Sequence, residues 1–189
     1  MEPTNYTDII DLDKSHMAEA QSLSNEASWN QVTSDWSMMI ANGDAIGIQD
    51  KNGRVIASAL SLPYGNQFGW ISMVIVTEVW RKKGLATLLL KSCIERLETR
   101  GLIPVLDATP AGQNVYQPLG FLPHFAFERW EHNAVESIFS KRPSNDSVRD
   151  ASKSDLAKLY KKDLQIFGGK REFVIESLLH RSSQFSAIA

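Results

Sequence analysis

The sequence predicts a mixed α/β fold in which a strongly twisted sheet carries helices on both faces. Two observations support this prediction. The apolar residues 68–76 lead into a glycine-containing turn and then into a segment with helical periodicity. A second apolar stretch, residues 103–108, follows that helix. The region therefore has the order strand, turn, helix, strand of a βαβ unit.

The helix of this unit is defined by an apolar stripe. Apolar residues recur at spacings of three and four, at Leu85, Leu88, Leu89, Cys93 and Leu97. Gly101 follows where helices commonly end in a left-handed residue. Further toward the N-terminus, residues 44–49 and 55–62 flank a turn that contains Asn52 and Gly53, which is a strong hairpin signal.

The turn between the central strand and the helix is predicted to bind an anion. The first amides of a helix have no intrahelical acceptor, and the positive end of the helix dipole lies behind them. Arg81, Lys82 and Lys83 add positive charge beside these amides, while Gly84 and Ala86 allow a ligand to approach the backbone closely. We therefore expect this turn to hold phosphate groups.

Composition excludes several classes of partner. The chain has 189 residues, of which 43% are hydrophobic and 22% charged, with a net charge of −2, one cysteine and four histidines. A near-neutral charge gives no overall attraction to nucleic acid or anionic membranes. The sequence contains no signal peptide pattern, no membrane-length apolar run and no metal-ligand spacing. We expect a cytoplasmic protein that binds no nucleic acid, membrane or metal.

Two motifs narrow the choice of fold. The chain lacks the P-loop and dinucleotide-binding strings, and it has no nucleophile elbow of a hydrolase. It has R-x-x-G-x-A at Arg81, Gly84 and Ala86, and Y-x-x-L-G-F from Tyr116 to Phe121. In this order and at this separation, the motifs resemble those of the GNAT family of acyl-CoA-dependent N-acetyltransferases. The resemblance extends over roughly residues 3–132.

The resemblance implies further elements of the fold. Family members begin with a strand and two helices, which residues 6–12 and 15–41 can supply. It also implies a closing strand at residues 121–129. The predicted acetyltransferase domain spans residues 1–132.

The resemblance also implies a chemistry. GNAT enzymes move an acetyl group from acetyl-CoA directly to an amine, here expected to be a primary amine of a small molecule. Tyr116 matches the general acid that protonates the departing thiolate. The expected cofactor-binding residues are Val74, Ile75 and Val76 beside pantetheine, and Arg81, Lys82, Lys83, Gly84, Leu85, Ala86 and Thr87 around the diphosphate.

The general base and the acceptor site are less defined by sequence. Trp70, Ser72 and Val74 occupy alternating positions of the central strand, where many family members have a glutamate. The candidate bases are Glu26, Asp107, His124 and Glu128, and we favour Asp107 at the end of a strand. Carboxylates and aromatic faces attract a cation, so the predicted acceptor residues are Glu26, Trp29, Trp70 and His124. The missing glutamate favours an alternative, a non-catalytic module that binds acyl-CoA as a sensor or scaffold.

The C-terminal third is predicted to be a short helical segment behind a linker. Residues 133–147 are polar and rich in turn formers, and Ser152 and Asp155 form a capping-box pattern. An offset of 139 residues aligns four identities between the two ends of the chain, at Asp11, Lys14, Ser15 and Ala18. Residues 148–189 resemble the start of a second GNAT-like domain. The presence of this segment leaves the oligomeric state open, and a homodimer is one alternative to a monomer.

Overall fold

The computed structural model describes residues 5–128, 149–181 and 187–188, and it confirms the predicted fold class. Neighbouring strands from β1 to β4 are antiparallel, and β5 pairs with β4 in parallel. The hairpin and the central strand form where predicted, whereas the first predicted strand is regular only over β1. The five-stranded sheet has the order β1 (Ile10–Asp11), β2 (Asp44–Gln49), β3 (Val55–Tyr64), β4 (Phe68–Val76), β5 (Ile103–Leu106).

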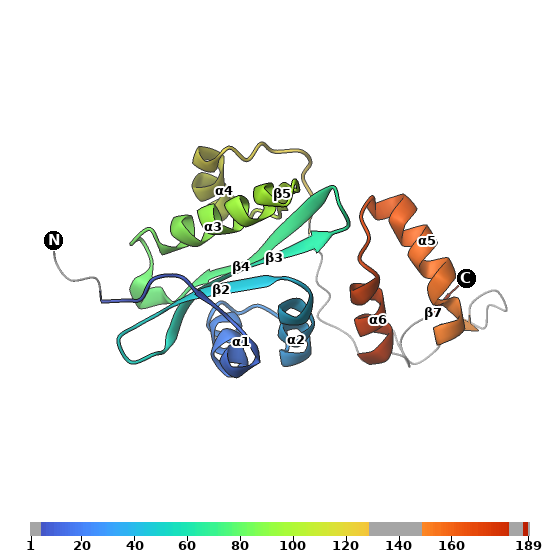
Figure 1. Cartoon of the computed structure of the whole chain (residues 1–189), viewed down its shortest axis with the longest axis horizontal. Coiled ribbons are helices and arrows are strands. Elements are labelled where there is room, and N and C mark those ends of the chain that lie inside the picture. Colours follow the sequence, from blue (N-terminus) through green and yellow to red (C-terminus); the bar gives the residue numbers. More distant parts are fainter. Residues whose placement is uncertain (1–4, 129–148, 182–186, 189) are drawn as a thin grey trace.

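Helices cover both faces of the sheet (Figure 1). α1 (Met17–Glu26) and α2 (Thr33–Asn42) lie on one side, here called the α1/α2 face. α3 (Leu85–Thr99) and α4 (Pro110–Tyr116) lie on the other, here called the α3/α4 face. Short 3₁₀ turns add η1 (Lys14–His16), η2 (Glu78–Trp80) and η3 (Gln117–Leu119).

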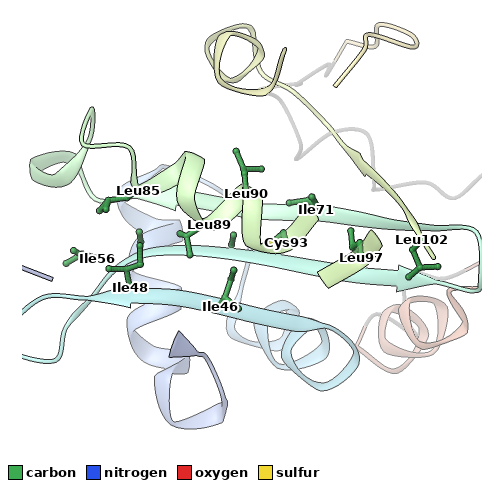
Figure 2. Packing of buried hydrophobic residues seen from close by; sticks show 12 residues of the cluster. Ile46, Ile48, Ile56, Ile71, Leu85, Leu89, Leu90, Cys93, Leu97 and Leu102 are labelled. Atoms are coloured by element: carbon green, nitrogen blue, oxygen red, sulfur yellow. The ribbon is translucent and has the colours of Figure 1, made fainter. Parts of the chain in front are cut away.

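The stripe of α3 forms the core of the α3/α4 face. Figure 2 shows side chains of α3 directed at isoleucines of the sheet, and these side chains are buried. Leu88 was predicted in the stripe but is 42% exposed, whereas Leu90 is fully buried. With 3.6 residues per turn, Leu90 lies nearer than Leu88 to the direction set by Cys93 and Leu97. Gly101 has a φ of 71° and ends the helix as predicted.

A β-bulge interrupts β4. Met73 has a left-handed φ of 54°, and the pairing of β3 with β4 slips between Ser58 and Leu60. The buried Ser58 hydroxyl donates a hydrogen bond of 2.9 Å to the Met73 carbonyl oxygen. A backbone conformation that is unfavourable for methionine is thus held by a buried contact from the neighbouring strand.

The bulge changes which residues of β4 face each side of the sheet. Ile71 packs in the α3/α4 core, so Trp70 and Ser72 face the α1/α2 side. After the bulge Ile75 packs in the α1/α2 core and Val74 turns to the α3/α4 side. The alternating positions Trp70, Ser72 and Val74 therefore do not share one face, because an extra residue in a strand reverses the alternation that follows it.

β4 and β5 separate halfway along β4. β5 pairs only with residues Phe68–Ile71 of β4, and Leu106 at the end of β5 lies opposite Ile71. Beyond this point, the edge of β4 that faces β5 has no strand partner in the described part of the chain. The result is a split in the sheet next to Val74, Ile75 and Val76.

The closing strand predicted at residues 121–129 does not form over residues 121–128, and Arg129 lies outside the described residues. The prediction rested on the family resemblance, but Leu122, Phe125 and Phe127 are 88%, 72% and 57% exposed. Pro123 also lacks an amide hydrogen for a ladder. Residues 121–128 therefore form neither a regular strand nor a helix.

The C-terminal segment forms a helical hairpin with a small sheet. Along the chain, β6 (Arg149–Asp150) is followed by α5 (Leu156–Phe167), α6 (Glu172–Arg181) and β7 (Ala187–Ile188). β6 and β7 pair antiparallel. The predicted cap is present at η4 (Lys153–Asp155), where the backbone N–H and the hydroxyl of Ser152 both donate to the Asp155 carboxylate. The predicted linker, residues 133–147, lies outside the described residues.

The elements of this segment follow those of the N-terminus at the offset found in the sequence. β1, η1, α1 and α2 begin at residues 10, 14, 17 and 33. β6, η4, α5 and α6 begin at residues 149, 153, 156 and 172, each 139 residues later. The same order of strand, turn and two helices therefore occurs twice in the chain.

The C-terminal hairpin packs against the first part of the chain through charged and aromatic contacts. Arg181 of α6 forms an ion pair of 2.6 Å with Asp35 of α2 and donates to the Ser34 hydroxyl at 2.7 Å. The ring of Phe167 lies 5.2 Å from that of Tyr64, edge to face. These contacts hold the hairpin at the end of the sheet where β3 turns into β4 (Figure 1).

We expect Gly69→Ala to destabilise the protein by roughly 1–3 kcal/mol, the usual cost of overpacking. A β-carbon at Gly69 would lie 2.2 Å from Cδ2 of Leu97, which is fully buried, so this side chain or the strand would have to shift. Urea unfolding of Gly69→Ala, of Leu97→Ala and of the double variant measures the change in the free energy of unfolding. In a Leu97→Ala background the cost of Gly69→Ala should fall, and an equal cost in both backgrounds would contradict this packing.

Candidate functional site

The loop before α3 has the backbone of an anion site. Gly84 is the N-cap of α3 with a φ of 81°, and Lys82 has a φ of 62°. A β-carbon placed on Gly84 would meet nothing within 4 Å. The glycine is therefore required by its conformation, and it leaves open space in front of the helix N-terminus.

The amides of residues 82–87 are available to a ligand. Before them, the N–H groups of Trp80 and Arg81 donate to Thr77 and Glu78 carbonyls. After them, the Leu88 N–H donates to the Gly84 carbonyl at 3.0 Å. The intervening amides have no acceptor among the residues that the structure describes, and no side chain caps α3. Consecutive free N–H groups at a helix N-terminus suit a diphosphate.

The basic side chains of the loop have partly structural roles. Arg81 Nε donates to the Val76 carbonyl oxygen at 3.0 Å. Lys83 Nζ lies 4.4 Å from the ring centroid of Trp80. Leu85 is buried in the core and ties the loop to the sheet, so its predicted contact with a ligand can come only from its backbone. The positive charges of these side chains remain beside the loop amides, but most of the hydrogen-bond donors of the loop are backbone N–H groups.

The split in the sheet leads from this loop to the middle of β4. Val74 and Val76 face the α3/α4 side, and the edge of β4 at these residues is open toward β5. Backbone groups at the open edge can pair with an extended ligand as a strand would. The predicted cofactor residues of the strand and of the loop therefore follow one another along the chain, from the open edge of β4 to the start of α3.

Tyr116 lies on the α3/α4 side of the split, at the end of α4. The Thr109 hydroxyl accepts the Gly112 N–H at 3.1 Å and caps this helix, and Pro110 occupies its first turn. The Tyr116 ring packs edge to face with Phe121 at 6.2 Å. Burial raises the pKa of Tyr116, and within the described ranges its hydroxyl has no hydrogen-bond partner. The side chain is thus a protonated donor at neutral pH.

Asp107 and Trp70 come together at a hollow of about 320 Å³. Asp107 directly follows Leu106, so it stands where β5 leaves β4. The hollow is lined by Tyr64, Trp70, Asp107, Phe125, Phe127, Phe167 and Arg171. The predicted base and one predicted acceptor residue therefore share a small aromatic site.

Glu26 does not join this site. Its carboxylate accepts the Thr77 hydroxyl at 2.7 Å and the Glu78 N–H at 2.6 Å. Thr77 follows the last residue of β4, while Trp70 is near its start, about 20 Å away at the usual strand rise. Hydrogen bonds from Thr77 and Glu78 lower the pKa of Glu26. Glu26 holds the turn that leads into residues 81–87, here called the anion loop, and it does not face the hollow.

The other two predicted acceptor residues lie outside the lining of the hollow. Trp29 follows the end of α1 and is 40% exposed. His124 is exposed and stands edge-on to Phe125 at 5.7 Å. His124 is thus one residue from the lining, whereas no contact of Trp29 connects it to this site.

The sequence did not indicate the remaining residues that line the hollow. Phe167 and Arg171 belong to the C-terminal hairpin, about a hundred residues after Trp70 in the chain. The Phe-Gly-Gly-Lys-Arg stretch at residues 167–171 marks a helix end, but nothing in its spacing indicates where it packs. Phe125 and Phe127 lie in the segment that was predicted as a strand.

A comparison with protein families identifies the fold of this site. The profile of the acetyltransferase (GNAT) family matches residues 11–121, more than half of the chain. The chain belongs to the GNAT acetyltransferase family. The match spans the anion loop, the split and Tyr116. The GNAT family uses acetyl-CoA, and the unpaired amides before open space at Gly84 fit its diphosphate.

Solved structures agree with this assignment. An acetyltransferase of Trypanosoma brucei is 19% identical with a TM-score of 0.56, and the match covers 66% of this GNAT chain and 99% of that one. A candidate acetyltransferase of Clostridium acetobutylicum, crystallised with acetyl-CoA, is 16% identical with a TM-score of 0.52, at 67% and 99% coverage. At these identities the comparison establishes the fold. No match was found among curated proteins.

One neighbour also includes the C-terminal segment. A candidate acetyltransferase of Pyrococcus horikoshii is 15% identical with a TM-score of 0.69, and the match covers 96% of this chain and 64% of that one. Such coverage must include most of residues 149–188. Among the described residues of the GNAT protein, no helix is long and apolar enough to cross a membrane.

We expect Gly84→Val to weaken acetyl-CoA binding at least tenfold. A branched residue is strained at a φ of 81°, and its side chain would project into the open space before the amides. Calorimetric titration with CoA measures the affinity. Gly53→Val is the matched control, because Gly53 has a φ of 79° in open space within the hairpin turn. Unchanged affinity in Gly84→Val would contradict the loop assignment.

We expect Glu26→Gln to weaken acetyl-CoA binding severalfold, because it removes the anionic acceptor that holds Thr77 and Glu78. A lowered folded-state pKa means that this stabilisation is fully present above the unfolded pKa, about 4.3, and is lost as the pH falls through the folded-state value. Urea unfolding should show a difference between wild type and Glu26→Gln that is largest near neutral pH and shrinks on acidification. Glu95→Gln, an exposed change on α3, should show no such pH dependence.

Proposed function

We propose that this GNAT protein transfers the acetyl group of acetyl-CoA directly to a primary amine of a small molecule in a ternary complex. The observation that supports this most strongly is the row of free amides at residues 82–87 beside the split in the sheet. In this proposal the amides hold the diphosphate, and the open edge of β4 at Val74, Ile75 and Val76 pairs with pantetheine. A β4 amide then polarises the thioester carbonyl.

Tyr116 acts as the general acid in this proposal. The amine nitrogen bonds to the carbonyl carbon, the carbon–sulfur bond breaks, and the CoA thiolate takes the phenol proton. A phenol of pKa about 10 can donate to a thiolate whose conjugate acid has a pKa of about 8.5 when the two are hydrogen-bonded. Burial keeps the Tyr116 phenol protonated, and its hydroxyl has no hydrogen-bond partner among the described residues, so it is available to the thiolate in this proposal.

Asp107 acts as the general base. An alkyl ammonium with a pKa near 10 is about one part in a thousand neutral at pH 7, which adds roughly 4 kcal/mol to the barrier. Asp107 lies at the point where β4 and β5 separate, while Tyr116 packs on the α3/α4 side. The two residues can therefore serve the acceptor and the leaving group from opposite sides of the split.

A second candidate is a non-catalytic module that binds acyl-CoA. It is favoured by β4 itself, where Trp70 and Ser72 face the α1/α2 side and neither is a carboxylate. Release of thiol from acetyl-CoA in a panel of amines separates the two candidates. Tight CoA binding with no thiol release for any amine would favour the module.

We also propose that the chain contains an acetyltransferase domain at residues 1–132 and a second GNAT-like unit that begins near residue 148. The constant offset of 139 residues between β1, η1, α1, α2 and their C-terminal counterparts supports this division. The extended match to the Pyrococcus horikoshii structure is consistent with it.

We expect Tyr116→Phe to lower turnover by one to two orders of magnitude and to leave the CoA affinity nearly unchanged, because the ring still packs on Phe121 while the proton donor is lost. Thiol release and calorimetry measure the two quantities. Tyr160→Phe, which removes a hydroxyl bonded to Glu176 in the C-terminal hairpin, is the control. Lost affinity with unchanged turnover would assign Tyr116 to binding.

A further inference from the structure

The lining of the hollow beside the split includes one acidic and one basic side chain. Asp107 contributes a carboxylate from the end of β5, and Arg171 contributes a guanidinium from the turn between α5 and α6. Burial raises the pKa of Tyr64 in the same lining, while the charge of Arg171 lowers it and that of Asp107 raises it. A volume of about 320 Å³ is at the lower end for small-molecule sites. The charge pattern is that of a site for a small zwitterion.

Arg171 is held in one orientation. Its Nε and Nη2 donate to the two oxygens of Asp163 at 2.9 and 2.7 Å. The guanidinium carbon lies 3.6 Å from the ring centroid of Phe167, and the side chain is only 32% exposed. In the part of the chain that the structure describes, Nη1 has no partner. Its N–H groups remain as donors on a preorganised, planar cation that suits a carboxylate.

Aromatic rings make up the rest of the lining of the hollow. Trp70 and Phe167 lie 5.9 Å apart with their planes tilted by 31°. Tyr64 meets Phe167 edge to face at 5.2 Å. Together these rings offer an apolar surface on which a flat apolar body can pack. They come from the end of β3, the start of β4 and the end of α5, so the site exists only when the hairpin is in place.

We infer that this hollow is the acceptor site and that it selects an amine carrying a carboxylate on an aromatic or similarly flat apolar body, with Arg171 as the specificity-determining residue. The ammonium faces Asp107, loses its proton there, and its nitrogen bonds to the acetyl carbon as the thiolate leaves. The carboxylate lies against Nη1 of Arg171. This inference rests on the proposed function.

The test compares L-phenylalanine with phenethylamine, which lacks only the carboxylate. Thiol release from acetyl-CoA gives kcat/KM for each amine, and calorimetry gives their affinities. We expect the wild type to prefer L-phenylalanine at least tenfold. Arg171→Gln should lower that ratio by roughly ten- to hundredfold, as for loss of a hydrogen bond to a charged group. Arg171→Lys should retain an intermediate ratio.

Asp163→Asn is the matched control for a purely structural role of Arg171. It loosens the guanidinium that Asp163 orients but does not remove it, so the preference for L-phenylalanine should fall much less than in Arg171→Gln. An equal loss of the ratio in Asp163→Asn and Arg171→Gln would overturn the inference, because the turn itself would then explain the effect.

The outcomes also separate this inference from the proposed function. Equal use of both amines by the wild type would overturn the inference and leave acetyl transfer intact. Binding of L-phenylalanine that depends on Arg171, without thiol release from acetyl-CoA, would support the ligand class and overturn the transfer reaction. The inference would also be overturned if L-phenylalanine did not bind and was not preferred over phenethylamine.

Discussion

The incomplete pairing of β4 is the constraint on which the site depends. β4 is bonded to β3 along its length, but β5 accompanies it only as far as Ile71. A strand edge with unpaired amides and carbonyls needs another partner. The bulge at Met73 lies at this point and reverses the side chains that follow. The end of β5 therefore opens the sheet, and the bulge turns Val74 and Val76 toward the α3/α4 side.

The rest of the site is arranged around this opening. The anion loop lies at the end of β4, and Glu26 anchors its start through Thr77 and Glu78. Tyr116 stands on the α3/α4 side, while Asp107 and the aromatic hollow lie at the mouth of the split. In the proposed reaction, this arrangement lets acetyl-CoA and the amine approach from different sides. The C-terminal hairpin contributes Phe167 and Arg171, so a segment outside the matched family region shapes the hollow.

Local signals predicted most of the fold. The 3.6-residue periodicity located α3, the Asn-Gly pair located the hairpin, and the capping pattern at Ser152 located the start of the C-terminal helices. These signals act between residues close in the chain. The closing strand failed because a strand is made by its partner, and the exposed Phe125 and Phe127 found none in the described sheet. Leu88 was misplaced because spacing alone does not say which side of a broad apolar stripe meets the sheet.

By itself, the sequence determined the order of elements, the glycine at the head of α3 and the placement of Tyr116, since each depends on backbone conformation or on a motif of a few residues. Only the tertiary structure decided what stands near what. It moved Glu26 to the anion loop, joined Asp107 with Trp70, and brought Arg171 across a hundred residues of chain to face them. The physical reason is that side chains in a site are brought together by packing between distant segments, and spacing along the chain carries no record of that packing.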